Sequence, residues 1–267
     1  MQRIYAIANQ KGGAGKSTTT QILGAGLAKA GKKVLLIDLD PQSNLSSLVG
    51  AVTDAQDKNV VTMLEVLTEE HNIKEGIQHM HSYDIVPASM FLASVDGRIP
   101  NQLARPYRLQ KALESIRGKY DYILIDTPPA LGTLTNNALI AASEVIIPAQ
   151  ADVLSLQGVA QLAETISAAR EHANPGLAIS GIALTRYNGR ARLSRELAAM
   201  FETAAKQLNT VVFKTHIREA VAVKEAQAAQ QDIFSYAPQS NPAQDYAALI
   251  YDIFTIDIQE KEAQKDA

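Results

Sequence analysis

The stretch "NQKGGAGKSTTT", residues 9 to 20, decides how this chain folds. It joins a short apolar run, "RIYAIAN" at residues 3–9, to an alanine-rich helical pattern that begins at Ser17. A strand, a glycine-rich turn and a helix in this order make an anion site. The glycines let successive backbone N–H groups point inward, and the first helical turn adds its positive dipole end. The stretch therefore predicts a phosphate-binding loop.

The loop departs from the standard phosphate-loop pattern, G-x-x-x-x-G-K-[ST], at its beginning. Gly15, Lys16 and Ser17 match the second half of that pattern. Gln10 stands where the first glycine is expected, and Lys11 follows it directly. An ordinary glycine-rich turn would explain the glycines, but it would not explain Gly-Lys-Ser at the start of a helix. We therefore interpret the stretch as a phosphate site.

The polar side chains of the loop have distinct predicted roles. The Lys16 ammonium would lie on the β- and γ-phosphates, the Ser17 hydroxyl would ligate Mg²⁺, and Thr18 would reach the α-phosphate. ATP and Mg²⁺ are thus the expected cofactors. The nucleotide-binding residues predicted from the loop are Gly12, Gly13, Ala14, Gly15, Lys16, Ser17 and Thr18.

The rest of the chain alternates between two kinds of apolar pattern. Runs typical of buried strands occupy residues 3–9, 32–40, 121–129, 143–150 and 176–187. Helical patterns lie at 107–117, 133–142, 157–172, 191–207 and 242–254. This alternation predicts an α/β fold of the P-loop NTPase type, a mostly parallel twisted sheet with helices on both faces. We expect one domain over residues 1–255 and a solvated C-terminal tail over 256–267.

Three aspartates stand at the ends of two predicted strands. Asp126 ends "YILID", and Asp38 and Asp40 end "VLLIDLD". Open parallel sheets place ligands at the carboxyl ends of their strands, so all three carboxylates should converge on the loop. One such aspartate alone would fit a solvated strand end equally well. Three together favour a metal and phosphate site, with Ser17 and Asp126 as the expected metal residues.

The composition restricts the class of protein. The chain has 267 residues, 46% of them hydrophobic and 20% charged, which is typical of a globular protein. It has no cysteine, which excludes disulfides, cysteine nucleophiles and cysteine-held iron–sulfur clusters. No apolar run approaches the roughly 20 residues of a membrane span, and the N-terminus lacks the pattern of a secretion signal. We expect a cytoplasmic protein.

Binding to nucleic acid would need a local basic patch, because the formal net charge is −3. The best candidate is "RYNGRARLSREL", residues 186–197, whose first ten residues contain no acid. Flexible basic side chains there could neutralise phosphates without reading sequence, although an ordinary solvated helix face is the alternative. The candidate DNA-binding residues are Arg186, Arg190, Arg192, Arg195, Lys214, Arg218 and Lys224.

Several motifs together resemble one family. "KGGAGKSTTT" looks like the deviant Walker A motif of the ParA/MinD superfamily of P-loop ATPases, which has a signature lysine where Lys11 stands. The stretch "LLIDLDPQSNLS" at 35–46 resembles the segment that follows this motif in ParA proteins. The stretch "YDYILIDTPPALGTLTNNALIAASEVIIPAQADVLSLQG" at 120–158 resembles their Walker B region. The segment at 226–254 also reads like a ParA C-terminus, so the resemblance covers nearly the whole chain.

The resemblance assigns roles to particular residues. Two monomers would sandwich two nucleotides, with Lys11 reaching the partner's ATP, where it would act like an arginine finger supplied in trans. A solvated loop lysine is the alternative for Lys11. Asp40 would position the attacking water, so Lys11, Lys16 and Asp40 are the expected catalytic residues. Asp38 would support Mg²⁺ or Lys11, and Asn44 would lie near the γ-phosphate.

The sequence specifies the switch region and the adenine contacts less directly. Pro128 and Gly132 would lie in a switch that follows Asp126. Many relatives carry a proline–arginine pair where this chain has "KTHIREAV", residues 214–221, so the adenine contacts do not transfer directly. Asn188 and Arg218 are the candidates for further nucleotide contacts.

Small Soj-like ParA proteins are the branch that the chain resembles most. Membership implies an ATP-dependent homodimer that binds DNA without sequence preference, associates with the nucleoid, and is stimulated by a ParB-like centromere-binding partner during plasmid or chromosome segregation. A MinD-like membrane-surface ATPase is the alternative, but "DIQEKEAQKDA" at 257–267 has neither an apolar face nor a basic bias. A metal or cofactor carrier is a third possibility, for which the chain offers no cysteine ligand. We therefore expect no membrane partner.

Overall fold

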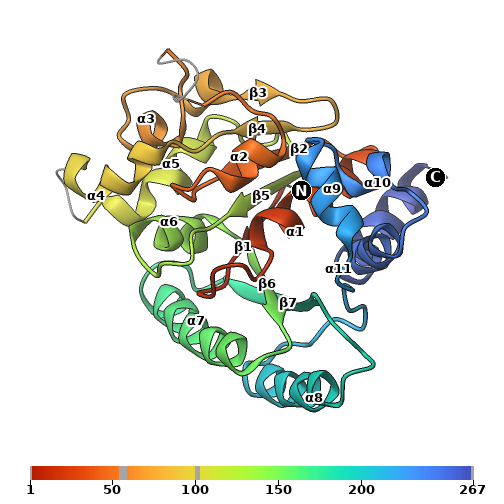
Figure 1. Ribbon diagram of the computed structural model, residues 1–267. Helices are drawn as coiled ribbons and strands as arrows, with labels where there is room; N and C mark the ends of the chain where they lie inside the picture. The colour runs from red at the N-terminus through yellow and green to blue at the C-terminus, as the bar shows by residue number, and fades with distance from the viewer. Residues whose placement is uncertain (1, 54–58, 100–102, 266–267) are drawn as a thin grey trace.

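The computed structural model describes residues 2–53, 59–99 and 103–265, with side chains described through residue 254. Within these residues seven strands form one sheet in the order β3-β4-β2-β5-β1-β6-β7 (Figure 1). All neighbouring strands pair in parallel except β3 and β4. The strands are β1 (Arg3–Ile7), β2 (Val34–Asp38), β3 (Gln78–His79), β4 (Asp84–Val86), β5 (Tyr122–Asp126), β6 (Glu144–Gln150) and β7 (Ala178–Thr185).

Helices cover both faces of the sheet. Figure 1 shows α9, α10 and α11 beside α1 on one side, and the hydrophobic core there joins these helices to the strands. The other core packs α3, α5, α6, α7 and α8 against the opposite face. The helices are α1 (Lys16–Lys29), α2 (Asn44–Leu48), α3 (Met63–Leu67), α4 (Val95–Arg98), α5 (Arg108–Glu114), α6 (Thr133–Ala141), α7 (Val153–His172), α8 (Arg192–Gln207), α9 (Val221–Ala228), α10 (Ile233–Tyr236) and α11 (Asn241–Lys265).

The central strands divide their side chains between the two cores. In β5, Tyr122 and Leu124 face the α1 side, whereas Ile123 and Ile125 face the α7 side. Every residue of β2 and of β5 is buried. Because successive side chains alternate between faces, a strand covered on both faces reads as a continuous apolar run. This confirms the predicted mostly parallel sheet with helices on both faces.

Two strands escaped the sequence analysis. β3 and β4 have two and three residues, too few for a recognisable apolar run, and they form one edge of the sheet. The helix expected at 157–172 begins earlier, at Val153, because the Asp152 carboxylate caps it by accepting the Ser155 N–H. The backbone of α11 is helical through Lys265, beyond the expected residue 254. The division into a domain and a solvated tail stays a prediction.

The strand order brings the predicted site residues to one edge of the sheet. β1 lies between β5 and β6, and β5 lies between β1 and β2. The register pairs Asp126 with Ile7 on one side and with Asp38 on the other. Parallel strands end at the same edge, so the loop that follows β1 emerges beside both aspartates.

An aromatic cluster holds the last helix against the centre of the sheet. The Phe254 ring of α11 meets the rings of Tyr5 and Tyr122 edge-on, with centroids 5.2 and 5.3 Å apart. All three side chains are buried. Edge-to-face packing adds to the apolar area that the rings remove from water. Phe254 therefore fastens α11 to β1 and β5.

Removal of this ring should destabilise the whole domain. We expect Phe254→Ala to lower the free energy of unfolding by about 3–5 kcal/mol, because the substitution leaves a cavity between α11 and the sheet. Urea denaturation followed by circular dichroism measures the change. Tyr251→Ala, on the same helix but largely exposed, should cost clearly less. Equal losses for the two variants would contradict this anchoring role.

Candidate functional site

The loop between β1 and α1 has the backbone of an anion site. Gly13 and Gly15 have φ angles of 75° and 91°, in the left-handed region that favours glycine. Gly15 directly precedes the first helical residue, Lys16. The bend turns the free N–H groups of the loop and of the first turn of α1 toward the same space.

Three polar side chains hold the outer side of this loop. Asn9 Oδ1 accepts the Lys11 N–H at 3.0 Å, and Gln150 Nε2 donates to the Gly13 carbonyl at 2.7 Å. The Thr185 hydroxyl donates to the carbonyl of Ala14 at 2.9 Å. These bonds occupy backbone groups on the outside of the loop. Asn9, Gln150 and Thr185 were not among the predicted site residues, although each stands at or just after a strand end, the rule that had identified the aspartates.

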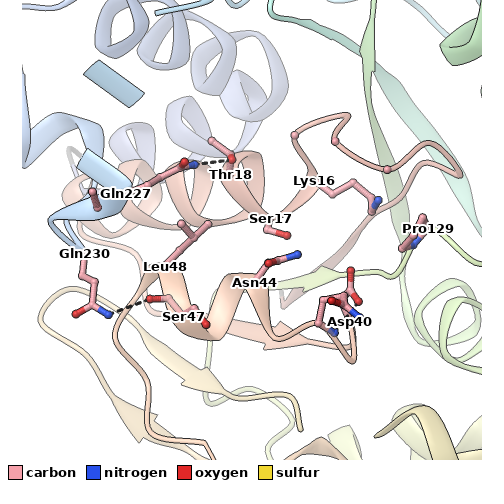
Figure 2. Close-up of a pocket in the computed structure, with 15 residues that line it drawn as sticks. Lys16, Ser17, Thr18, Asp40, Asn44, Ser47, Leu48, Pro129, Gln227 and Gln230 are labelled. Atoms are coloured by element: carbon pink, nitrogen blue, oxygen red, sulfur yellow. Dashed lines mark hydrogen bonds between the residues drawn. The ribbon is translucent and has the colours of Figure 1, made fainter. Parts of the chain in front are cut away.

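A cavity of about 630 Å³ opens in front of the loop. Figure 2 shows Lys16, Ser17 and Asn44 directed into it, with Asp40 and Pro129 on one side and Gln227 and Gln230 on the other. Ala14 is buried beneath it, as is Pro128 beside Pro129. The predicted residues that line this cavity are Gly12, Gly13, Gly15, Lys16, Ser17, Thr18, Asp40 and Asn44.

Lys16 is a buried cation with acidic neighbours. Only 7% of the residue is exposed, and burial lowers the pKa of its ammonium. The charges of Asp126 and Asp40 oppose that shift. An anion in the cavity would stabilise the buried Lys16 ammonium. The ammonium would in turn reduce the repulsion between that anion and the carboxylates of Asp126 and Asp40.

Asp126 and Asp38 lie side by side at the ends of β5 and β2, and both are fully buried. Burial raises the pKa of Asp126 well above its usual range, Asp38 adds to the shift, and the Ser17 hydroxyl and Lys16 oppose it. Burial also raises the pKa of Asp38, to about 6, against hydrogen bonds from Ser46 and Asp40. Two adjacent buried carboxylates require additional positive charge to remain ionised together.

The two carboxylates differ in how they are satisfied. Neither oxygen of Asp126 has a well-formed hydrogen bond in the part of the chain that the structure describes. Asp38, in contrast, accepts bonds from Asp40 N, Ser46 N and the Ser46 hydroxyl. Asp126 therefore fits a hydrated cation better than Asp38 does. The metal role of Asp38 stays a prediction, and its observed bonds shape the loop that carries Asp40.

A cation at Asp126 would also depend on the nucleotide. No group of three or more His, Cys, Asp or Glu residues arranged to hold a metal exists among the described residues. Mg²⁺ usually binds through one or two protein oxygens together with phosphate oxygens and water. The unsatisfied Asp126 carboxylate and the nearby Ser17 hydroxyl match that donor set.

Lys11 does not extend into solvent. Its Nζ atom lies 2.5 Å from Asp152 Oδ2 and 3.4 Å from Gln150 Oε1, and its side chain is 24% exposed. Burial would raise the pKa of Asp152, but Lys11 and the Ser155 N–H outweigh burial and lower it. The alternative of a solvated loop lysine does not describe this side chain. In the single chain, Lys11 is held by the residues that lead into α7.

A second, smaller cavity of about 180 Å³ continues along the loop. It shares Gly13, Gly15, Thr18 and Gln227 with the first cavity, and adds apolar atoms of Ile217, Ala220, Val223 and Tyr246. The segment that replaces the family's proline–arginine pair therefore lines this second cavity. Asn188, predicted to contact the nucleotide, lines neither cavity, and its side chain accepts the Arg190 N–H.

Helix α9 forms a wall common to both cavities. Gln227 Nε2 donates to the Thr18 hydroxyl at 2.8 Å, and Gln230 Nε2 donates to the Ser47 carbonyl at 3.1 Å (Figure 2). These bonds connect the end of α9 to α1 and α2. No sequence pattern pointed to Gln227, because its partner lies 209 positions away in the chain.

The predicted DNA-binding residues separate into two groups. Arg186, Arg218 and Lys224 line the second cavity. Arg186 pairs with Glu219, and Arg218 makes a two-point ion pair with Asp245 at 2.6 and 2.9 Å. Both acids lie outside residues 186–195, the stretch that contains no acid. The fold therefore places acids that are distant in the sequence beside these basic residues. The other four residues, Arg190, Arg192, Arg195 and Lys214, are exposed and line neither cavity.

Two arginines of this second group also have partners within the chain. Arg192 pairs with Glu196 one turn along α8, although 86% of its side chain is exposed. Arg195 donates to the carbonyls of Gly189 and Arg190 and so shapes the preceding loop. A surface ion pair such as Arg192–Glu196 is worth little and can exchange for a phosphate. Arg190 and Arg192 are thus the strongest DNA candidates at this loop.

Helix lengths and hydropathy give no membrane-spanning candidate among the described residues.

Comparisons with known proteins agree on one family. A family model described as an AAA domain matches residues 2–179. The sporulation initiation inhibitor protein Soj of Bacillus subtilis is 37% identical, over 95% of this chain and 98% of that protein. The chromosome-partitioning ATPase Soj of Treponema pallidum is 36% identical, over 96% and 99%. The structure of a cobyrinic acid a,c-diamide synthase of Mycobacterium smegmatis, bound to an ATP analogue and magnesium, is 31% identical with a TM-score of 0.80, over 94% and 93%.

The buried ammonium provides the first test of the site. We expect Lys16→Ala to weaken ATP binding at least about 100-fold, because it removes the charge-assisted bonds to phosphate and leaves Asp126 facing the anion. Isothermal titration calorimetry measures the affinity, and circular dichroism checks the fold. Lys33→Ala, an exposed lysine before β2, serves as the control and should bind normally. Tight ATP binding by Lys16→Ala would rule out this loop geometry.

Proposed function

Since the chain belongs to the ParA/MinD superfamily of P-loop ATPases, we propose that it is a Soj-type partition ATPase that works as a nucleotide-dependent switch on DNA. In this proposal ATP closes a homodimer, the dimer binds DNA without sequence preference, and a ParB-like centromere-binding partner stimulates hydrolysis and release. The observation that carries the proposal is the buried pair of Lys16 and Asp126 beside a two-part cavity of nucleotide size.

The two cavities suit the two ends of a nucleotide. In this proposal the larger one holds the phosphates against the loop N–H groups and Lys16. The smaller one offers apolar atoms of Ile217 and Val223 for a base. Ser17 and Asp126 would hold Mg²⁺, which when bound neutralises phosphate charge. The solved relative with an ATP analogue and magnesium supports this assignment.

Asp40 is the residue proposed to orient the attacking water. It lines the large cavity and is almost fully buried, and one of its carboxylate oxygens accepts the Gln42 N–H at 3.0 Å. This bond fixes the orientation of the carboxylate and leaves the other oxygen for a water molecule. Asn44, four residues after Asp40, also lines the cavity. The loop from Asp38 to Asn44 thus presents two polar side chains toward the phosphate end.

The ion pair of Lys11 with Asp152 supports a switch between two positions of this lysine. If Lys11 acts in trans, it must exchange Asp152 and Gln150 for a phosphate of the partner's nucleotide. Val153 and Leu154, which follow Asp152 at the start of α7, are 56% and 66% exposed. A second copy covering this region would bury both apolar side chains, which favours a dimer at this edge.

Nucleotide binding on this fold also occurs in a protein with another task, the M. smegmatis cobyrinic acid a,c-diamide synthase. The site therefore supports ATP binding more directly than it supports a partner. The length and identity of the match to two Soj proteins favour DNA partition. A MinD-like membrane-surface ATPase remains the competing proposal.

Co-sedimentation of the wild-type protein separates the two proposals. With Mg²⁺ and ATP we expect it to pellet with long DNA of any sequence, and with ADP to remain in the supernatant. The reason is that only the ATP-bound dimer presents two copies of the basic surface. It should not pellet with anionic liposomes in either state. Binding to liposomes but not to DNA would replace the partition proposal with the membrane one.

Variants of the ion pair test the trans role of Lys11. We expect Lys11→Ala to bind ATP within a few-fold of wild type but to form no ATP-dependent dimer, because the lost charge belongs to the partner's site. Light scattering measures the dimer, and phosphate release measures turnover. Asp152→Asn, which keeps the side-chain size but weakens the hold on Lys11, should dimerise at lower ATP concentration than wild type. A normal dimer with normal turnover in Lys11→Ala would exclude the trans role.

The exposed arginines test the DNA surface. We expect the double substitution Arg190→Ala and Arg192→Ala to weaken binding about equally on unrelated duplexes and to flatten the slope of log affinity against log salt by about 1 to 2. ATP binding and dimerisation should persist, because neither residue lines a cavity. Arg117→Ala, an exposed arginine after α5, is the control. An unchanged affinity and salt slope would place the DNA surface elsewhere.

A further inference from the structure

Ser46 is a buried polar residue for which the proposed mechanism gives no role. It lies in α2, and none of its surface is exposed. Its hydroxyl donates to Asp38 Oδ2 at 2.7 Å and accepts the Ala88 N–H at 3.0 Å. Its own N–H also donates to Asp38 Oδ2, at 2.9 Å. A single side chain thus connects the end of β2 with the segment that follows β4.

The two partners of the hydroxyl determine its orientation. A backbone N–H can only donate, so the bond from Ala88 uses a lone pair of the Ser46 oxygen. The hydroxyl proton is then free to point at the Asp38 carboxylate, which accepts it. A hydroxyl that would otherwise rotate is therefore fixed in one direction.

This contact closes the loop that carries Asp40. Asp38 Oδ1 accepts the Asp40 N–H at 3.0 Å, while Asp38 Oδ2 takes both bonds from Ser46. The Asp38 carboxylate thus ties together the two ends of residues 38–46. The loop between them presents Asp40 and Asn44 to the cavity. A change at Ser46 would loosen the loop without removing any group that faces the cavity.

The segment on the other side of Ser46 is anchored twice. The Pro87 carbonyl accepts the Met63 N–H at 2.9 Å, and Ala88 donates to Ser46. The 3-10 helix η2 (Met90–Ser94) starts directly afterwards, where Ser89 Oγ accepts the Phe91 N–H. Because the Met63 anchor remains when the Ser46 hydroxyl is removed, the end of β4 should keep its place in the fold.

We propose that Ser46 is a positioning residue for ATP hydrolysis, acting through Asp38 to hold the Asp40 loop in its reactive geometry. The inference rests on the proposed ATPase function. Ser46 does not line the cavity that would hold the nucleotide, so we do not call it a catalytic residue. Its hydroxyl fixes the path of the loop against the rigid end of β4, and that path decides where the Asp40 carboxylate lies.

The first test separates turnover from binding in Ser46→Ala. We expect kcat to fall about tenfold to a hundredfold, the size expected for loss of one buried bond to a charged group, while the dissociation constant for ATP stays within about threefold. Ser46→Thr, which keeps the hydroxyl, should recover most of kcat. Wild-type kcat in Ser46→Ala overturns the proposal, as does an equal loss of affinity and kcat, which indicates general damage to the site.

Ser94→Ala is a matched control. The Ser94 hydroxyl donates to the Phe91 carbonyl at 2.7 Å in the same segment, but it does not reach Asp38. We expect its kcat to equal that of wild type. A loss of kcat like that of Ser46→Ala would assign the effect to a loosened η2 and overturn the proposal. If Ser46→Ala does not fold, Ser46→Cys, close in volume but a weaker donor, replaces it under the same criteria.

Hydrogen exchange provides a readout that does not depend on turnover. In the nucleotide-free protein, the Ala88 amide should exchange at least about tenfold faster in Ser46→Ala, because its N–H loses its acceptor. Unchanged exchange there means that the Ser46–Ala88 bond does not form, and it overturns the proposal even if kcat falls. A wild-type protein that binds but never hydrolyses ATP refutes the ATPase function, whereas the exchange result still decides the contact.

Discussion

The burial of charge at the carboxyl edge of the sheet is the constraint on which the site depends. Asp126, Asp38 and Lys16 are all buried within one small region. Each would be costly alone in a low dielectric, and their perturbed pKa values record that cost. A bound cation and polyphosphate would add both signs of charge in the right places. The site is thus suited to a ligand that brings charges of both signs.

Polar side chains at the ends of the strands hold the loops that carry these buried charges. Asn9, Gln150 and Thr185 follow or end β1, β6 and β7, and each bonds to the phosphate loop or to the strand beside it. Asp38 does the same for its own loop through Ser46 and Asp40. Because these side chains stand at or just after the ends of strands in a sheet covered by helices on both faces, the loops inherit the rigidity of the core.

Helix α7 connects the nucleotide site with the rest of the surface. Its capping residue, Asp152, binds the Ser155 N–H and the Lys11 ammonium at once. Gly158, two turns further, packs so closely that a Cβ atom there would lie 3.1 Å from Asn9 Oδ1. A movement of Lys11 out of its ion pair therefore removes a contact from the residue that caps α7. A helix in contact with the loop and exposed on its outer face is suited to report the nucleotide state.

The sequence by itself determined the fold class, the phosphate loop and the convergence of Asp38, Asp40 and Asp126, because strand periodicity, glycine turns and strand ends are local features. Short elements such as β3 and β4 escaped it, since two or three residues carry no periodicity. Only the tertiary structure decided the partners of the charged side chains. Lys11 meets Asp152, Arg186 meets Glu219 and Arg218 meets Asp245, across 141, 33 and 27 positions. Nothing in a local pattern specifies which distant residue the fold will bring within bonding distance.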